Sequence, residues 1–249
     1  MKKQHPGILA ILPLLSFAEC DAVTTIPVTN AGFEDTTGQT TFNEFTFGVP
    51  QGWAVYDPFD VHPSAGLFIG TLRPNGTEFF NSTAPEGNRV AILFNSSRRG
   101  EGEYGYSQEL SVVLAANSHY RLTVMVGNIA SGTDEGGTFY NLDEFPGYRV
   151  ELMAGGTVLS MDDNSLSIAE GEFATSTVTF TTGASHAQLG QNLGIRLISE
   201  NILPPGSPAF MEVDFDDVGL TVDPVPEPQA LILCALGLGA LAWRRSRVG

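Results

Sequence analysis

The chain has 249 residues, with 28 acidic side chains against 12 basic ones and a formal net charge of −16 at pH 7. Setting aside the two lysines of residues 1–22 and the three arginines near the C-terminus leaves seven basic residues. Setting aside Glu19 and Asp21 leaves 26 acidic ones, so the remainder carries about −19. This charge disfavours nucleic acid and anionic membrane surfaces as partners and favours divalent cations.

Residues 1–22 have the pattern of a secretory signal peptide. Met1-Lys2-Lys3 supplies a positive start, residues 8–17 form an apolar stretch, and Ala18 or Ala22 is a small residue at which a signal peptidase could cut. We therefore expect a signal helix that is removed on export.

The only two cysteines are Cys20 in the signal segment and Cys234 near the C-terminus. No disulfide can therefore stabilise the exported domain between them. About 200 residues is enough chain for a core that stabilises a domain by burial alone. Bound metal ions are a second possible source of stability.

Between residues 23 and 222, short alternating runs are separated by Gly, Pro, Asn and Asp, which is typical of strands. Gly155-Gly156 predicts a tight hairpin, because paired glycines supply the positive φ that such turns need. Asp162-Asp163-Asn164 marks another boundary. The fold class predicted is all-β, an antiparallel β-sandwich of jelly-roll type. The clearest predicted strands are 89–94, 119–126, 148–153, 157–160, 174–181, 194–199 and 209–222.

Neither an internal repeat nor a change of composition divides this region before Asp223-Pro224. We therefore expect one domain over 23–222, a Pro-rich linker over 223–229, and a C-terminal segment over 230–249. Outside the two terminal segments no stretch has a sustained helical period.

Two motifs stand at opposite ends of the predicted domain. The first is VTNAGFED, residues 28–35, and the second is EVDFDDVGL, residues 212–220. Together they resemble the signatures of calcium-containing jelly rolls related to carbohydrate-binding modules. The resemblance implies that Glu34 and Asp216 bind a structural calcium, Ca2+. Carboxylates and backbone carbonyls from adjacent strand ends are suitable ligands for this ion.

Simple strand alternation predicts Asp214, Asp216, Val218 and Leu220 on one face of the last strand. An aspartate beside a core-facing valine would need compensation when buried, and a cation supplies it. The alternative is that these acids are solvated at the end of a strand.

A closer resemblance, to the Stig-type calcium-dependent cyclases, covers most of the predicted domain. It is carried by segments 27–34, 52–53, 87–91, 107–110, 120–128 and 148–159. The resemblance implies an apolar pocket in which an aspartate donates a proton to an isonitrile-bearing indole terpenoid. We place this acid on Asp214, since an apolar pocket would raise its pKa. Aromatic rings that would surround a developing cation are those of Tyr104, Tyr106, Phe139 and Tyr140.

Trp53 follows Gly52 and is close in sequence to other aromatic residues. It is either a platform on which a sugar ring stacks or a core residue packed between sheets. The segment 134–145, rich in acids, glycine and aromatics, is the expected loop over a ligand site. An extracellular polysaccharide is accordingly a candidate partner.

The C-terminal segment combines Pro226-Glu227-Pro228, an apolar run over 230–243, and a cluster of Arg244, Arg245 and Arg247. As a helix, the apolar run spans only about 21 Å, which makes a short membrane anchor. The arginines would keep the end of the chain in the cytoplasm.

These three parts resemble the PEP-CTERM sorting signal, which implies cleavage near the Pro-Glu-Pro by an exosortase-type protease. We therefore expect export, a transient stay in the inner membrane, and then a cell-surface or extracellular location. This signal favours a noncatalytic surface or matrix protein that binds glycans. The alternative is the cyclase-like enzyme with Asp214 as proton donor.

Overall fold

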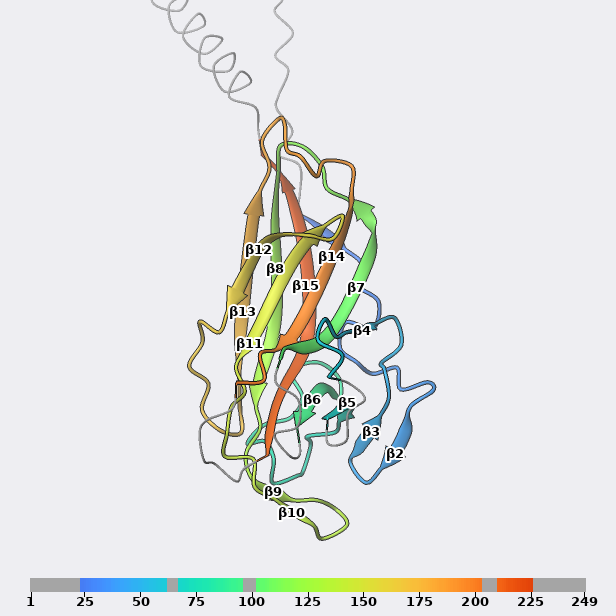
Figure 1. Cartoon of the computed structure of the whole chain (residues 1–249), viewed down its shortest axis with the longest axis vertical. Coiled ribbons are helices and arrows are strands. Elements are labelled where there is room, and N and C mark those ends of the chain that lie inside the picture. Colours follow the sequence, from blue (N-terminus) through green and yellow to red (C-terminus); the bar gives the residue numbers. More distant parts are fainter. Residues whose placement is uncertain (1–22, 62–66, 96–101, 203–209, 226–249) are drawn as a thin grey trace, which may run out of the picture. The chain divides into compact units, whose positions relative to one another are not determined.

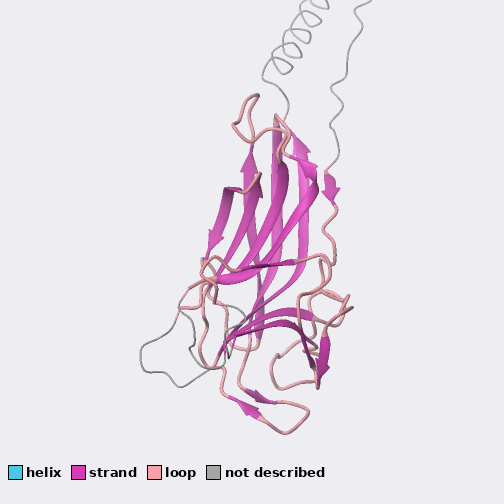
Figure 2. Cartoon of the chain, turned by 45° about the vertical axis from the view of Figure 1, so that its right-hand side comes forward, coloured by secondary structure: helices cyan, strands magenta, loops and turns pink. Residues whose placement is uncertain are grey.

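The computed structural model describes residues 23–61, 67–95, 102–202 and 210–225, which form one compact unit from Val23 to Val225 (Figure 1). The predicted signal helix and the sorting tail with its 230–243 helix lie outside the described residues. Within the described ranges the chain consists of strands and loops, and it contains no helix of the length and apolarity that a membrane crossing requires (Figure 2).

A larger sheet contains eight strands in the order β13-β8-β15-β6-β5-β3-β2, with β1 paired to β15. Its neighbouring strands all pair antiparallel. The bounds are β1 (Thr24–Ile26), β2 (Thr40–Phe42), β3 (Phe45–Phe47), β5 (Leu67–Leu72), β6 (Val90–Asn95), β8 (Ser118–Asn128), β13 (Glu172–Thr181) and β15 (Met211–Pro224).

A smaller sheet has five strands in the order β12-β11-β14-β7-β4, again antiparallel. A short hairpin, β9 with β10, stands apart. These bounds are β4 (Ala54–Tyr56), β7 (Tyr104–Val113), β9 (Gly132–Thr133), β10 (Phe139–Tyr140), β11 (Tyr148–Ala154), β12 (Thr157–Asp163) and β14 (Asn192–Ser199). The predicted all-β, antiparallel sandwich is confirmed, and each of the seven predicted runs is a strand.

The hairpin between β11 and β12 turns at Gly155 and Gly156, whose φ angles are +56° and +79°. Both angles lie in the left-handed region, where glycine has no Cβ to clash. The pattern did not predict β7, although it is a long strand with buried alternate positions. The predicted loop 134–145 contains β10.

Apolar side chains from both sheets meet in the main core. Val213, Phe215 and Leu220 on β15 pack with Val150 on β11 and Leu197 on β14, all of them fully buried. Because these β15 residues face the smaller sheet, Glu212 and Asp214, which alternate with them, face the opposite side of the larger sheet.

A β-bulge interrupts β15 and corrects the predicted face assignment. The pairing with β8 shifts register between Asp216 and Gly219, and Asp217 has φ of +47°. The extra residue reverses the alternation, so that Val218 and Leu220 enter the main core while Asp214 and Asp216 point to the other side.

A second core covers that other side of the larger sheet. Ile92 and Phe94 of β6 and Leu72 of β5 pack there against Phe79 and Phe80. The latter two belong to the loop that joins β5 to β6. Figure 1 shows β2, β3, β9 and β10 gathered at the same end of the molecule. This end of the larger sheet is therefore enclosed by loops and hairpins.

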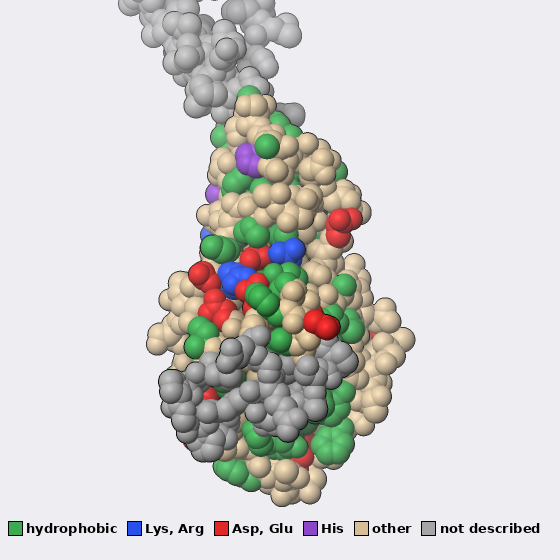
Figure 3. All heavy atoms as spheres, in the orientation of Figure 1, with side chains coloured by type: hydrophobic (Ala, Val, Ile, Leu, Met, Phe, Trp, Pro, Cys, Tyr) green, Lys and Arg blue, Asp and Glu red, His purple; other side chains and the backbone are tan. Residues whose placement is uncertain are grey.

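The smaller sheet presents a charged outer face. Arg149 forms ion pairs with Glu103 and Glu151, and Arg196 pairs with Glu151 while its guanidinium lies 4.3 Å from the centre of the Tyr56 ring. Figure 3 shows basic and acidic side chains gathered near the middle of the visible face. These pairs compensate one another's charge.

Candidate active site

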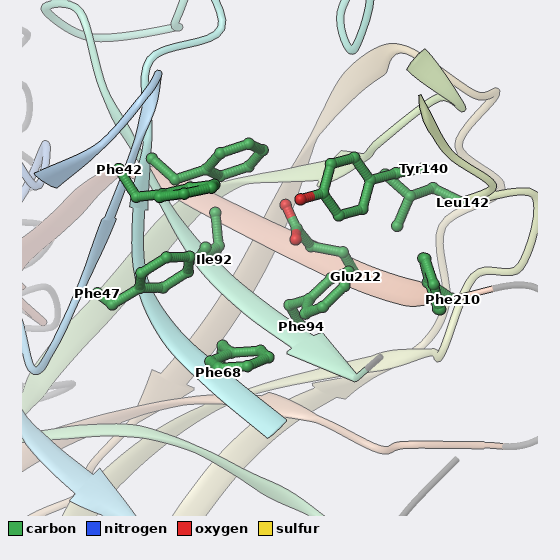
Figure 4. A pocket seen from close by; sticks show the side chains of 10 residues that line it. Phe42, Phe47, Phe68, Ile92, Phe94, Tyr140, Leu142, Phe210 and Glu212 are labelled. Atoms are coloured by element: carbon green, nitrogen blue, oxygen red, sulfur yellow. The ribbon is translucent and has the colours of Figure 1, made fainter. Parts of the chain in front are cut away.

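An aromatic pocket of about 290 Å³ lies at the enclosed end of the larger sheet (Figure 4). Residues from β2, β3, β5, β6, β10 and β15 form its walls, and nine of the ten lining side chains are aromatic or aliphatic. Several rings contact one another edge to face, including Phe94 with Tyr140 and with Phe210. The lining residues are Phe42, Phe45, Phe47, Phe68, Ile92, Phe94, Tyr140, Leu142, Phe210 and Glu212.

Glu212 is the charged residue of this lining. It pairs with Phe94 across β15 and β6, and strand pairing places both side chains on the pocket side. Its side chain is 1% exposed, and its Oε1 has no hydrogen-bond partner. In Figure 4 the Glu212 carboxyl points toward the hydroxyl of Tyr140. A ligand in this pocket would therefore meet one acidic group among aromatic walls.

Asp214 lies two positions further along β15, on the same face and deeper in the protein. It pairs with Ile92 on one side and Gly127 on the other, its exposure is 0%, and neither carboxyl oxygen has a hydrogen-bond partner among the described residues. A Cβ on Gly127 would come within 2.9 Å of the Asp214 Cβ. The Phe173 ring packs on the same glycine and stacks on Phe80 at 4.3 Å.

These surroundings favour the protonated, neutral form of Asp214. Burial raises its pKa well above the ordinary aspartate range, and the Glu212 carboxyl beside it adds to the rise. Burial also raises the pKa of Glu212. The two carboxyls lie on one strand face, and burial favours the protonated form of both. The pair therefore holds at least one proton that is available for transfer.

The four predicted cation-facing aromatics occupy different places. Tyr140 lines the pocket, whereas its neighbour Phe139 is 63% exposed. Tyr104 and Tyr106 lie in the main core. The Tyr106 hydroxyl accepts the Gly70 N–H at 2.9 Å and donates to the Ile92 carbonyl at 2.8 Å, which ties it to the strands beneath the pocket. The Tyr104 hydroxyl is buried without a partner.

Trp53 lies in the main core and not on a surface that a sugar could reach. It is 7% exposed, its ring stacks on Phe33 at 5.3 Å, and its Nε1–H donates to the Asn30 carbonyl at 3.2 Å. Of the two roles that the sequence allowed, a platform for a sugar ring or a core residue, the structure supports the core residue.

The two predicted calcium ligands both hold the loop 86–89. Glu34 Oε1 accepts the N–H groups of Asn88 and Arg89 at 2.6 and 2.7 Å, and Asp216 Oδ2 accepts that of Glu86 at 2.8 Å. Burial raises the pKa of Asp216 to about 8. Among the described residues no three His, Cys, Asp or Glu side chains lie close enough together to hold a metal ion.

Sequence reasoning missed most of the pocket wall, including Glu212. A signal was available in TFNEFTF, residues 41–47, where aromatic side chains are unusually dense. Another was the two-residue spacing of Phe210, Glu212 and Asp214, which places them on one strand face. Neither signal shows which other strands complete the wall.

The family described as HpiC1-like, HpiC1 cyclase, matches residues 24–221. The chain therefore belongs to this cyclase family. The PEP-CTERM protein-sorting motif matches residues 224–247. It identifies an exported protein that is sorted to the cell envelope or surface and processed by an exosortase-type system. No curated protein matches the chain.

Several solved cyclase structures resemble this chain over nearly all of their own length. An apo cyclase from Fischerella sp. is 39% identical with a TM-score of 0.71, covering 82% of this chain and 98% of its own. A Stig cyclase, Fisc, from Fischerella sp. TAU, in complex with (3Z)-3-(1-methyl-2-pyrrolidinylidene)-3H-indole, is 40% identical with a TM-score of 0.71. It covers 82% of this chain and 100% of its own.

A cyclase from the same organism, in complex with 4-(1H-indol-3-yl)butan-2-one, is also 40% identical, with a TM-score of 0.70 over 82% of this chain and 100% of its own. A xylan-binding domain from Paenibacillus barcinonensis reaches only 15% identity and a TM-score of 0.41. A likeness this weak does not indicate that the chain binds glycans.

Proposed function

We propose that this protein is an exported cyclase that uses Asp214 to protonate an apolar, indole-bearing substrate in the aromatic pocket. The observation that carries the proposal is the buried Asp214 carboxyl, which has no hydrogen-bond partner among the described residues and lies two positions along β15 from the pocket residue Glu212. Family membership and the indole ligands of the related cyclases support the choice of substrate class.

The reaction starts with transfer of the Asp214 proton to an alkene or indole carbon, which leaves a carbocation on the substrate and a carboxylate on Asp214. An acid is most effective when its pKa is near the working pH, and the raised pKa of Asp214 keeps the proton in place until substrate binds.

The cation is then captured by a carbon–carbon double bond of the same molecule, which closes a ring and leaves a new cation. Loss of a proton from that cation to the Asp214 carboxylate yields the neutral product and regenerates the acid. The faces of Phe94, Tyr140 and the other pocket rings stabilise the positive charge, and the apolar walls exclude water that would otherwise trap it.

Calcium is proposed as a structural ion held by Glu34 and Asp216. Both are hard oxygen donors, and both already contact the loop 86–89, where backbone carbonyls would complete the ligand set. Ala31 accepts the Val218 N–H at 3.1 Å, so the first motif lies directly beside the last strand. A bound cation would offset the cost of burying Asp216.

The sorting signal supports a location outside the cytoplasm for the proposed reaction. We propose that the 230–243 segment holds the protein briefly in the inner membrane, and that cleavage near Pro226–Pro228 then releases or relinks the domain. Its substrate would accordingly be an apolar compound available at the cell envelope.

A turnover assay with an isonitrile-bearing indole terpenoid tests the proposed acid. We expect Asp214→Asn to lower the rate of product formation by about 10² to 10⁴, because the variant has no proton to donate. The matched control is Asp60→Asn, a loop position whose positive φ of 55° asparagine tolerates. Product formation that is unchanged in Asp214→Asn would rule out the assigned role.

A further inference from the structure

Glu212 is an acid whose Oε1 finds no hydrogen-bond partner in the described part of the chain. Its side chain is 1% exposed, and it lines an otherwise apolar pocket. Burying such a group costs stability, and an apolar side chain of similar size would avoid that cost. A carboxyl retained here without structural need points to a ligand that uses it.

Asp214 does not account for this group. Glu212 stands in the pocket wall, whereas Asp214 lies two positions further along β15, paired with Ile92 and Gly127 of the neighbouring strands. A ligand that enters the pocket therefore contacts Glu212 before any other acid. The Tyr140 hydroxyl lies beside the Glu212 carboxyl (Figure 4), so the two polar groups mark one side of the bound ring.

We propose that Glu212 is the specificity-determining residue of this pocket, and that its carboxyl accepts a hydrogen bond from an N–H of a flat, apolar aromatic ligand. The choice of an indole as that ring rests on the proposed function. Rings of the same shape without an N–H donor leave the Glu212 carboxyl buried and unpaired, and they are rejected for that reason.

Size and chemistry of the pocket agree with this ligand class. Its volume of about 290 Å³ is at the small end for ligand pockets, which suits one fused ring system with a short side chain. Aromatic walls pack against both faces of such a ring. A carboxyl oxygen accepts a hydrogen bond whether or not the other oxygen of the same group carries a proton, so recognition does not depend on the protonation state of Glu212.

The test compares two probes by calorimetric titration. The probes are 4-(1H-indol-3-yl)butan-2-one and its N-methyl counterpart, which has the same ring without the donor. For the parent protein we expect the N–H probe to bind at least 10-fold more tightly, the range expected when a hydrogen bond to a buried acid is lost. Equal binding of the two probes, or binding of neither, would overturn the proposal.

Two variants separate the hydrogen bond from the bulk of the methyl group. Glu212→Leu removes the acceptor and should abolish most of the preference, whereas Glu212→Gln keeps a carbonyl oxygen and should retain it. Both replacements are close to glutamate in size and bury no charge, so both variants should fold, and their melting curves check this. A preference that persists in Glu212→Leu would assign it to the methyl group and contradict our inference.

The outcome is distinguishable from failure of the proposed function. An N–H preference that depends on Glu212 stands even when Asp214→Asn turns over substrate normally, in which case only the acid assignment fails. Conversely, turnover that requires Asp214 without any N–H preference in the parent leaves the proposed function intact and removes the role of Glu212.

Discussion

Glu212 and Asp214 lie two positions apart on one strand face, which brings two buried carboxyls together, and no basic side chain of the described residues forms an ion pair with them. The same burial that keeps their protons in place for chemistry also makes the folded protein sensitive to pH. An acid whose pKa is higher in the folded state than in the unfolded state binds its proton more tightly when folded.

We therefore predict that the domain loses stability as pH rises. The pKa of Glu212 is raised from its ordinary value of 4.5 to about 8, so its contribution is fully present below the ordinary value and is lost as pH approaches 8. Calcium-free protein should melt at least roughly 5 °C lower at pH 8 than at pH 5. Melting followed by circular dichroism at several pH values measures this difference.

Glu212→Gln is the matched variant for the pH experiment. Glutamine cannot ionise, so the melting temperature of the variant should vary less with pH, although Asp216, whose pKa is also raised to about 8, keeps part of the dependence. A parent melting temperature that rises between pH 5 and pH 8 would show that the buried carboxyl pair is not protonated in the folded state.

At the scale of elements, β15 serves two functions because of its bulge. Before Asp217 its acidic residues face the second core and the pocket, and after it Val218 and Leu220 face the main core. The strand also pairs with β1, β6 and β8, so it connects the first motif of the chain with the last. The loop 86–89 links Glu34 to Asp216 at this junction.

We predict that calcium stabilises this junction. A ligand that binds only the folded state stabilises it by about 2.7 kcal/mol when its free concentration is 100 times Kd. Removing calcium with a chelator should therefore lower the melting temperature by several degrees. Glu34→Gln and Asp216→Asn should each lose most of this shift, whereas Asp214→Asn should retain it. A melting temperature that does not respond to calcium would contradict the metal assignment. If Asp214→Asn lost as much of the calcium-dependent shift, Asp214 would belong to the calcium site and not to a separate acid site.

At the scale of the whole molecule, the domain ends slightly later than its sequence suggests. Asp223 and Pro224 still pair with His119 and Ser118, and Val225 donates its N–H to the Asn117 carbonyl at 2.7 Å. The sorting motif matches from residue 224 onward. The compact unit therefore ends directly before the Pro-Glu-Pro.

This arrangement predicts that sorting and folding are separable. A chain spanning 23–225 should melt at the same temperature as the cleaved protein, because its core and pocket use no residue beyond Val225 within the described part of the chain. In cells, replacing Pro226-Glu227-Pro228 should leave an uncut membrane form, and neutralising Arg244, Arg245 and Arg247 should weaken retention of the tail. Fractionation and immunoblotting measure both effects, and processing like that of the parent would contradict the sorting assignment.

Local pattern by itself determined seven of the fifteen strands in the described residues, the Gly155-Gly156 hairpin and the sorting motif, because each depends on residues that are neighbours in sequence. The resemblance to a family added the prediction of a cyclase fold and of Asp214 as the proton donor. The prediction that Asp216 shares a strand face with Val218 was wrong, because one bulge residue with positive φ reverses the alternation. The amino-acid composition carries no clear mark of such a bulge.

Only the tertiary structure decided what surrounds the acids. Phe42, Phe68, Phe94 and Tyr140 come from four strands that are far apart in sequence, and sheet order brings them around Glu212. The same packing places Trp53 and Tyr104 inside the main core. An aromatic residue gains free energy from burial in either place, so its identity alone does not distinguish a core position from a pocket wall. That distinction depends on which elements pack over it, and therefore on contacts between distant parts of the chain.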